Sequence, residues 1–292
     1  CGSSNSDMPT FAAWEATVLE HAYPYVDMIS LHAYYEEHEG DLASFLASAV
    51  DMDRMISTVV ATADHVAARL RSPKRIALSF DEWNVWYQAD FAGPQAEQWD
   101  DAPRLIEDTF NLADAVVVGD LLITLLRHAD RVAVACQAQL VNVIAPIRTE
   151  PGGPAWRQTI FHPFALTARW ARGEVLRLAV ESPTVSTARY GAVSALDATA
   201  TWDSDTGELA VFCVNRHPDA ELPLRVDLRG MGAMDVAEAL LLADSDVRAV
   251  NTADDPDRVR LRPFDVTSSD GGLELTLPPV SWAAVRLGPR SS

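Results

Sequence analysis

Long apolar runs and paired cysteines are missing from this sequence of 292 residues. A membrane-spanning helix needs roughly 18 consecutive apolar residues. The longest candidate, Ala113–Leu126, is interrupted by two aspartates and a glycine, so we expect a soluble protein. The three cysteines lie far apart and cannot form a disulfide framework, which favours a reducing compartment.

Positive charge is also scarce. The chain has 23 basic and 42 acidic residues, which gives a formal net charge of −19 and a pI near 4.6. A surface this acidic repels phosphate, so neither nucleic acid nor an anionic membrane is an expected partner. Lys74 is the only lysine, a bias that we attribute to a GC-rich genome.

Several motifs of common enzyme classes are absent as well. No HExxH, CxxC or aspartate-rich calcium loop occurs, so the sequence does not indicate a metal site. It has no Walker or GxGxxG phosphate loop and no GxSxG nucleophile elbow either. We therefore expect no cofactor.

The residues that are present indicate a folded protein. Hydrophobic residues make up 48% and charged residues 22% of the chain, which is typical of a globular protein. The length suggests about two domains, at roughly 150 residues per domain. Cys1 is either the lipidated start of a lipoprotein or the cut edge of a longer chain. Helix-like periodicity directly after Met8-Pro9-Thr10 favours the cut edge.

The first half, up to about Gly173, alternates short apolar runs with helical stretches, a pattern typical of βα units and a parallel sheet. The expected strands are Val26–Leu31, Arg75–Phe80 and Arg131–Leu140. The expected helices are Leu42–Leu70 (interrupted or split), Pro103–Arg127 and Thr159–Ala171.

The second half changes to short alternating segments separated by turn-rich stretches, which predicts an independent antiparallel sandwich without a catalytic role. The polar loop Asn251–Pro256 is expected to be exposed. The expected strand segments are Ser194–Trp202, Glu208–Asn215, Leu222–Leu228 and Leu273–Leu287.

Polar and aromatic side chains follow the three apolar runs of the first half, where a (β/α) barrel has its active site. The second run continues into FDEWNVWY. Aromatic faces stack on sugar rings, amides bind hydroxyls, and a carboxylate can attack or stabilise an oxocarbenium-like centre. Asp81 or Glu82 is therefore a candidate catalytic carboxylate. The alternative is an ion pair with an arginine, with Trp83 and Trp86 in the core.

Three weaker candidates follow the other runs. His32 is a general base, a metal ligand or a structural residue, and only one of Tyr34 and Tyr35 can point inward because they alternate in side. Gln137 and Gln139 share a face, as site residues or as barrel packing. The acidic run at 36–39 is interpreted as a solvated loop.

These residues resemble a known family. The segments LHAYY, LSFDEWNVWY, CQAQLVNVIAPI and AWRQTIFHPF, in this order, resemble the intracellular α-L-arabinofuranosidases of glycoside hydrolase family 51. The resemblance covers nearly the whole chain. It implies the C-terminal part of a (β/α)8 TIM barrel at residues 1–173, followed by a C-terminal β-sandwich at 174–292.

The resemblance also implies roles for individual residues. Glu82 would be the nucleophile at the end of the seventh strand, and Tyr34 would hydrogen-bond it. Gln139 would contact the arabinose hydroxyls, Trp86 would border the leaving group, and His32 would lie near the same site. The substrates would be arabinofuranosyl-containing oligosaccharides, hydrolysed in the cytoplasm without a metal or cofactor by an enzyme that forms homo-oligomers when complete.

One departure from the family is large. The general acid/base of the family is a glutamate after an asparagine, and no Asn-Glu pair occurs here. The chain therefore resembles the C-terminal portion of a retaining enzyme, and we expect this portion alone to be inactive. Two alternatives stay open: an inactive sugar-binding or interaction module, and another specificity of the same family, such as an endoglucanase or xylosidase.

Overall fold

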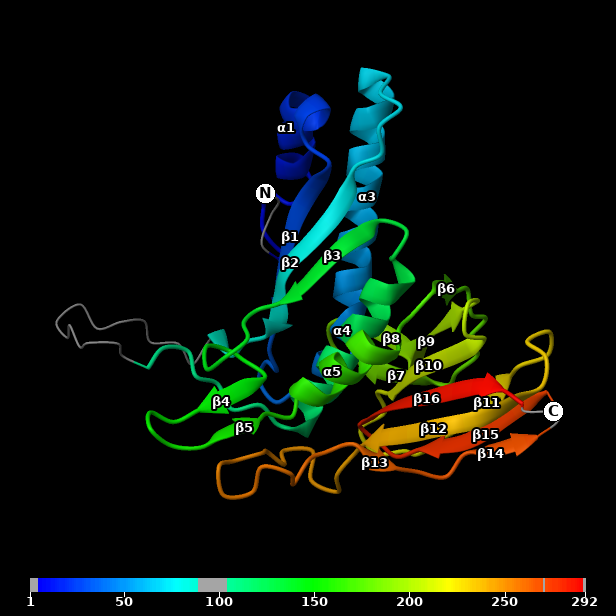
Figure 1. Ribbon diagram of the computed structural model, residues 1–292. Coiled ribbons are helices and arrows are strands. Elements are labelled where there is room, and N and C mark those ends of the chain that lie inside the picture. The colour runs from blue at the N-terminus through cyan, green and yellow to red at the C-terminus, as the bar shows by residue number, and fades with distance from the viewer. Residues whose placement is uncertain (1–4, 89–103, 270, 291–292) are drawn as a thin grey trace.

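The computed structural model describes residues 5–88, 104–269 and 271–290. Figure 1 shows a parallel sheet with helices beside it and, at the lower end of that sheet, an antiparallel sandwich. Cys1, which we interpreted as a lipidated start or a cut edge, lies outside the described residues.

The parallel sheet has three strands in the order β1-β2-β3. Their bounds are Met28–Tyr35 for β1, Ala77–Val85 for β2 and Val132–Gln137 for β3. The prediction that these segments are parallel neighbours is confirmed. The first two strands continue past the predicted ends at Leu31 and Phe80, because backbone pairing goes on after the apolar run stops. The described residues contain no closed barrel.

In the described part of the chain, five α-helices accompany the sheets: α1 (Ala13–Ala22), α2 (Leu42–Leu46), α3 (Ala49–Leu70), α4 (Leu112–Arg127) and α5 (Phe161–Trp170), with a short 3-10 helix η1 at Tyr23–Tyr25. The helical stretch predicted at Leu42–Leu70 as interrupted or split consists of the two helices α2 and α3, so that prediction is confirmed. The predicted start of α4 at Pro103 is wrong, since Asn111 and Asp114 cap the helix reciprocally at its true start.

Most strands are antiparallel. A six-stranded sheet in the order β13-β12-β16-β10-β9-β6 faces a three-stranded sheet in the order β11-β15-β14. The bounds of the larger sheet are Glu174–Leu176 (β6), Leu196–Asp203 (β9), Glu208–Asn215 (β10), Met234–Leu242 (β12), Arg262–Pro263 (β13) and Ser281–Pro289 (β16). The smaller sheet comprises Leu222–Asp227 (β11), Thr267–Ser269 (β14) and Gly272–Leu277 (β15). The predicted antiparallel sandwich is confirmed, although the segment expected at 273–287 is two strands.

Two hairpins complete the chain: β4 (Ile147–Thr149) with β5 (Ala155–Arg157), and β7 (Thr184–Thr187) with β8 (Gly191–Ser194). The second hairpin packs on the helices of the first half, where Val185 and Val193 contact Ala47 at the end of α2. This contact ties the segment after Gly173 to the residues before it.

The sandwich is not independent of the helices. One hydrophobic core joins α4 to the outer face of the six-stranded sheet, including Phe212, Val214 and Trp282. The approach is close at Gly119, where an added Cβ would lie 2.2 Å from Trp282 Cδ1. The prediction of an independent sandwich is therefore wrong, because the larger sheet is apolar on both faces and needs cover on both.

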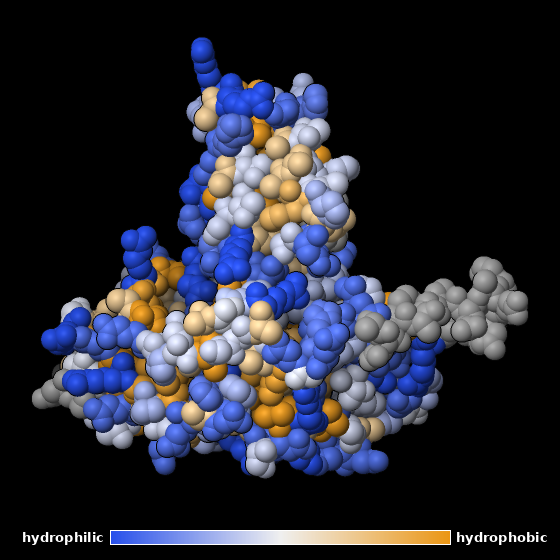
Figure 2. Space-filling view, turned by 180° about the vertical axis from the view of Figure 1, so that it is seen from behind, coloured by the Kyte–Doolittle hydropathy of each residue, from blue (hydrophilic) through white to orange (hydrophobic). Residues whose placement is uncertain are grey.

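The surface carries apolar residues among polar ones. Figure 2 shows them from behind, on the upright part and on the base. Large apolar side chains are exposed on α1, on η1 and at the start of β1, namely Trp14, Tyr25 at 86% and Met28, and Met8 before α1 is exposed as well. None of the described helices combines the length and apolar character needed to cross a membrane.

Candidate active site

A bulge in β2 places two consecutive carboxylates on the same face of the parallel sheet. Between the pairs Ser30↔Ser79 and His32↔Glu82, β1 advances by two residues and β2 by three. The register against β3 shifts in the same stretch. An extra residue re-aims the side chains that follow it, so Asp81 and Glu82 are both accessible while Phe80 and Trp83 are buried.

Glu82 is held by two side chains of β1. The Tyr34 hydroxyl donates a hydrogen bond to Glu82 Oε2 at 2.9 Å, and His32 Nδ1 lies 3.7 Å from the same oxygen. The Glu82 side chain remains 49% exposed, so a substrate can reach it. Burial, followed by the hydrogen bond to Glu82, raises the pKa of Tyr34 well above its usual value, which keeps the hydroxyl a donor.

Asp81 is more fully engaged within the protein. Ser30 Oγ donates to Asp81 Oδ1 at 2.6 Å, and His32 Nε2 lies 3.2 Å from that oxygen. Burial opposes ionisation here, but the Ser30 hydrogen bond and His32 outweigh it and lower the pKa of Asp81. The His32 ring thus stands between two carboxylates, and Glu82 is the one more exposed to solvent.

Aromatic side chains border the pair. The ring of Trp86 meets Tyr34 edge to face, with centroids 5.1 Å apart. Tyr35 points to the other side, is 7% exposed, and donates to Asp51. The prediction that only one of the two tyrosines faces the site side is confirmed.

Gln139 lies just past β3 and is exposed. Its position is set by the preceding residue, since Ala138 N–H donates to Trp83 O and Ala138 O accepts from Asn84 Nδ2 at 2.6 Å. Gln137 instead donates to Asn84 Oδ1 at 3.0 Å. The structure therefore brings His32, Tyr34, Glu82 and Trp86 together and places Gln139 beside the end of β2.

The sequence interpretation missed two polar features. The run at 36–39 is not entirely a solvated loop, because the Glu37 side chain is 6% exposed and forms a bidentate ion pair with Arg248 at 2.6 Å. The loop that begins at Asn251 is not exposed throughout, since Asn251 is 1% exposed and hydrogen-bonded by both ends of its amide. No local pattern reveals a pair separated by 211 residues.

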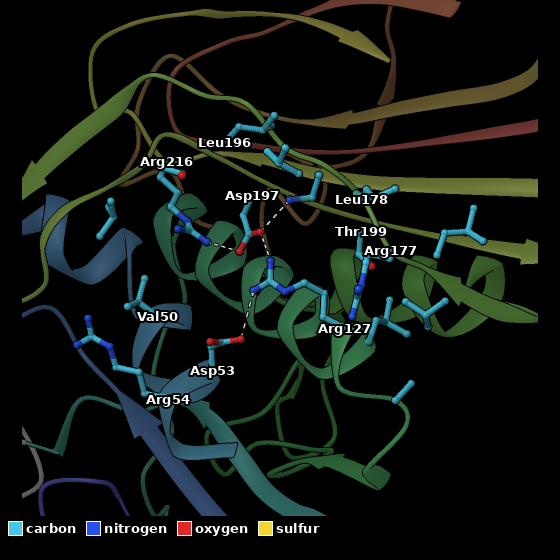
Figure 3. Close-up of a pocket in the computed structure, with 18 of the residues that line it drawn as sticks. Val50, Asp53, Arg54, Arg127, Arg177, Leu178, Leu196, Asp197, Thr199 and Arg216 are labelled. Atoms are coloured by element: carbon cyan, nitrogen blue, oxygen red, sulfur yellow. Dashed lines mark hydrogen bonds and ion pairs between the residues drawn. The ribbon is translucent and has the colours of Figure 1, made fainter. Parts of the chain in front are cut away.

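A large cavity lies away from these residues. The cavity has a volume of about 1010 Å³ and lies between the β6–β9 edge of the sandwich and the helices α3 and α4. Figure 3 shows that two of its arginines, Arg127 and Arg216, both bind Asp197. Charges already neutralised in this way tie the sandwich to α4, so we assign the cavity no catalytic role.

A metal site is not formed by the described residues, in which no three His, Cys, Asp or Glu side chains are arranged to hold an ion. The arrangement at β2 provides an exposed carboxylate, a hydroxyl donor, an imidazole and an aromatic border. These groups suit attack on the anomeric carbon of a sugar.

Comparison with known proteins agrees with this chemistry. Residues 81–281 match the family model of the alpha-L-arabinofuranosidase C-terminal domain. An intracellular exo-alpha-(1->5)-L-arabinofuranosidase of Streptomyces lividans is 57% identical over 98% of this chain and 43% of its own length. An intracellular exo-alpha-(1->5)-L-arabinofuranosidase of Halalkalibacterium halodurans is 46% identical over 99% of this chain and 57% of its own length.

A solved structure is similar as well. It is a family 51 alpha-L-arabinofuranosidase from Bifidobacterium longum, with a TM-score of 0.93 at 45% identity, covering 98% of this chain and 57% of that one. The chain thus spans about half the length of the relatives that it matches.

Proposed function

Because the chain belongs to the alpha-L-arabinofuranosidase C-terminal domain family, we propose that it is the C-terminal part of a retaining glycoside hydrolase. The complete enzyme removes terminal α-L-arabinofuranosyl residues from oligo- and polysaccharides. The observation that carries the proposal is the exposed Glu82 carboxylate, held by Tyr34 and His32 on the open face of β2. Relatives named intracellular support a cytoplasmic location.

In this proposal, residues 1–173 complete a (β/α)8 barrel and residues 174–292 form the sandwich domain. Parallel sheets are normally covered on both faces, yet alternate residues of β3, including Ala133 and Ala135, are exposed. The exposed apolar side chains near α1 and the start of β1 fit the same idea. Further βα units would cover these surfaces. The homo-oligomer expected of the complete enzyme stays a prediction.

The proposed mechanism has two displacements. Glu82 attacks the anomeric carbon while a second carboxyl group, supplied by another part of the complete protein, protonates the leaving oxygen. Water activated by that second group then releases arabinose with retained configuration, a scheme in which the carboxyl groups stand about 5–5.5 Å apart. The Tyr34 hydrogen bond orients the attacking carboxylate.

The remaining residues bind the sugar. Gln139 offers an amide to the arabinose hydroxyls, and Trp86 borders the leaving-group side beside Tyr34. His32 gives Asp81 and Glu82 different surroundings, because its Nε2 faces Asp81 and its Nδ1 faces Glu82. Protonated on both nitrogens, it would stabilise both negative charges.

The test uses the complete protein and an aryl α-L-arabinofuranoside. Glu82→Ala is expected to reduce kcat by at least 10⁴-fold, whereas Glu221→Gln on the exposed surface of the sandwich leaves it unchanged. Proton NMR of the first-formed arabinose should show retained configuration. Wild-type kcat in Glu82→Ala, inverted product, or binding without turnover in the wild-type protein would each overturn the proposal.

A further inference from the structure

Arg248 lies in the long connection between β12 and β13 of the sandwich, yet its side chain contacts Glu37, two residues after the end of β1. We propose that Arg248 is a positioning residue for the sugar site: its ion pair with Glu37 fixes the strand ends that carry Tyr34 and Trp86. The inference rests on the proposed function and adds the sandwich to the machinery of that site.

The ion pair of Arg248 with Glu37 is bidentate. Arg248 Nη1 and Nη2 donate to Glu37 Oε2 and Oε1, each at 2.6 Å. The Glu37 side chain is 6% exposed, whereas that of Arg248 is 49% exposed. A carboxylate with so little access to water needs a charged partner, and the two parallel bonds restrict orientation as well as distance. Glu37 is therefore held in one place by a residue of the sandwich.

Glu37 transmits this restraint to the site through two residues of backbone. Tyr35, the last residue of β1, accepts from Trp86 N–H through its carbonyl at 2.9 Å. Trp86 in turn packs edge to face on Tyr34, whose hydroxyl donates to Glu82. A shift of Glu37 would therefore move Trp86, Tyr34 and the hydrogen bond to the proposed nucleophile together.

The residue after Trp86 is anchored in the same region. Tyr87 donates through its hydroxyl to Asp114 at 2.6 Å and through its N–H to Asp108 at 3.0 Å. Burial raises the pKa of Tyr87, Asp114 and Glu37 raise it further, and Arg248 opposes them. Both Glu37 and Arg248 therefore act electrostatically on the hydroxyl of the residue that follows Trp86.

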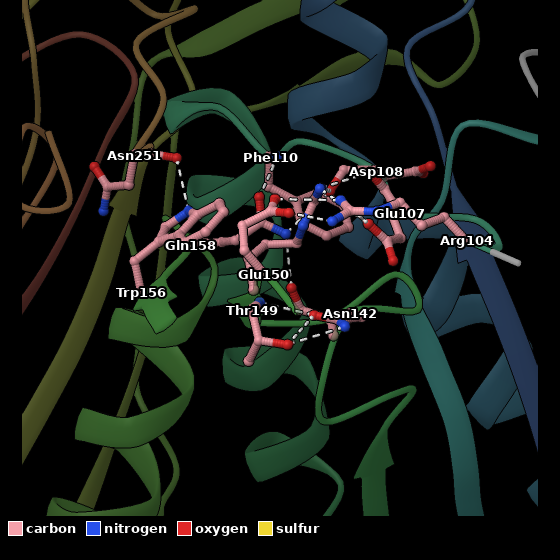
Figure 4. Close-up of polar contacts among 12 residues, drawn as sticks. Arg104, Glu107, Asp108, Phe110, Asn142, Thr149, Glu150, Trp156, Gln158 and Asn251 are labelled. Atoms are coloured by element: carbon pink, nitrogen blue, oxygen red, sulfur yellow. Dashed lines mark hydrogen bonds and ion pairs between the residues drawn. The ribbon is translucent and has the colours of Figure 1, made fainter. Parts of the chain in front are cut away.

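The connection that carries Arg248 is fixed at both sides of that residue. Val247 O accepts from Ala113 N–H at 3.1 Å, and Val250 forms a β-bridge with Asn111. The side chain of Asn251 donates to Arg157 O. The backbone carbonyl of Asn251 accepts from Trp156 Nε1 at 3.2 Å, as Figure 4 shows. The backbone on both sides of Arg248 is thus held by hydrogen bonds, which preorganises its ion pair with Glu37.

A second interpretation is that the ion pair only ties the sandwich to the parallel sheet. Such a tie would affect the unfolding temperature and leave the kinetics of the folded enzyme unchanged. A positioning residue acts on the transition state, because misplacement of reacting groups by about 1 Å can cost on the order of 100-fold in rate. Kinetics and stability therefore separate the two interpretations.

The experiment compares Arg248→Ala with Arg229→Ala in the complete protein. Arg229 likewise forms an ion pair, with Asp227 of the sandwich, but the Arg229 side chain is 82% exposed. At a temperature where all variants are folded, Arg248→Ala is expected to lower kcat by at least tenfold, with a smaller change in KM. The Arg229→Ala control should match the wild-type enzyme.

Two further variants test the pairing itself. Arg248→Lys keeps the charge but loses the bidentate geometry, so it should recover only part of kcat. The double variant Glu37→Arg with Arg248→Glu should be more active than either single charge reversal. Wild-type kcat in Arg248→Ala, or no recovery in Arg248→Lys and none in the double variant, would overturn the inference.

A readout that needs no turnover separates this inference from the proposed function. Hydrogen exchange of the peptide that contains Trp86 should accelerate in Arg248→Ala and not in Arg229→Ala, since the Trp86 amide is bonded to Tyr35 O. Unchanged exchange would contradict the inference even in an active enzyme. If the proposed function is wrong, that would appear instead in the kinetics of the wild-type and Glu82→Ala proteins.

Discussion

The parallel sheet and the six-stranded sheet of the sandwich differ in how their two faces are covered. On β10, alternate residues Leu209, Val211 and Cys213 join the core between the two sheets of the sandwich, and their neighbours Ala210, Phe212 and Val214 join the core shared with α4. Both faces are apolar and buried.

On β1 the same alternation separates apolar from polar side chains. Ile29, Leu31 and Ala33 enter the core, whereas Ser30, His32 and Tyr34 face the open side with the carboxylates of β2. The comparison teaches that the sheet buried on both faces stabilises the fold and that the half-covered sheet leaves room for the proposed sugar site. Substitutions should therefore change stability in one place and activity in the other.

The largest expected loss of stability follows from Arg216→Ala. Arg216 binds Asp120 through two hydrogen bonds and also pairs with Asp197, and Asp120 is completely buried. Leaving a buried charge without its partner costs about 3–5 kcal/mol. Calorimetry should show a large fall in Tm, while kcat of the protein that remains folded at low temperature stays near the wild-type value. An unchanged Tm would break the comparison.

The next effect is expected from Gly119→Ala. The new methyl group would meet the Trp282 indole at 2.2 Å, and both residues lie in the packed contact between α4 and β16. Overpacking of this kind costs about 1–3 kcal/mol. Urea unfolding should report the loss. Gly288→Ala in β16 is the matched control for the cost of a side chain at a glycine, since Gly288 has no left-handed φ and an added Cβ there meets no atom within 4 Å; equal losses in both variants would refute close packing as the cause.

A smaller, pH-dependent effect is expected at Asp114. Burial raises the pKa of Asp114 to about 7, compared with about 4 in the unfolded chain. The folded state therefore holds the proton more tightly, and this contribution to stability is complete below about pH 4 and is lost as the pH rises toward 7.

Asp114→Asn removes that dependence. The unfolding free energy of the wild type, relative to that of Asp114→Asn, should thus fall as the pH rises from 4.5 to 7, by at most about 1.4 kcal/mol per pH unit. Parallel Tm profiles over this range would contradict the raised pKa.

The smallest change in stability is expected from Tyr34→Phe, on the open face. The variant loses the hydroxyl that donates to Glu82, and because the Glu82 side chain is 49% exposed, water can take the place of that donor in the free protein. We expect kcat/KM to fall by about 10- to 100-fold and the unfolding free energy to change by less than about 0.5 kcal/mol. A large loss of stability with normal kinetics would reverse the assignment of the two sheets.

Much of the fold could be predicted from apolar patterning. The predicted bounds of β10, Glu208–Asn215, agree with the structure, because a continuous apolar run is bounded by turn residues on both sides. The strand β12 was not predicted, since its burial alternates irregularly along Met234–Leu242. A register shift opposite β16 disrupts that pattern, and it depends on the partner strand.

The site was predictable in part. Aromatic and amide residues after a carboxylate in FDEWNVWY indicated where a sugar would bind. The choice between Asp81 and Glu82 depends on the bulge in β2, which is a property of pairing with two neighbouring strands. The ion pair of Glu37 with Arg248 depends on the packing of the sandwich against the parallel sheet, which local sequence does not encode.

The most direct test of the central claim is covalent labelling of the nucleophile in the complete protein. A mechanism-based arabinofuranosyl inactivator, followed by peptide mass mapping, should place one sugar on Glu82. Asp81, which is adjacent and bonded to Ser30, should remain unlabelled, and Glu82→Gln should abolish labelling. A sugar found on Asp81 or on any other carboxylate would contradict the account.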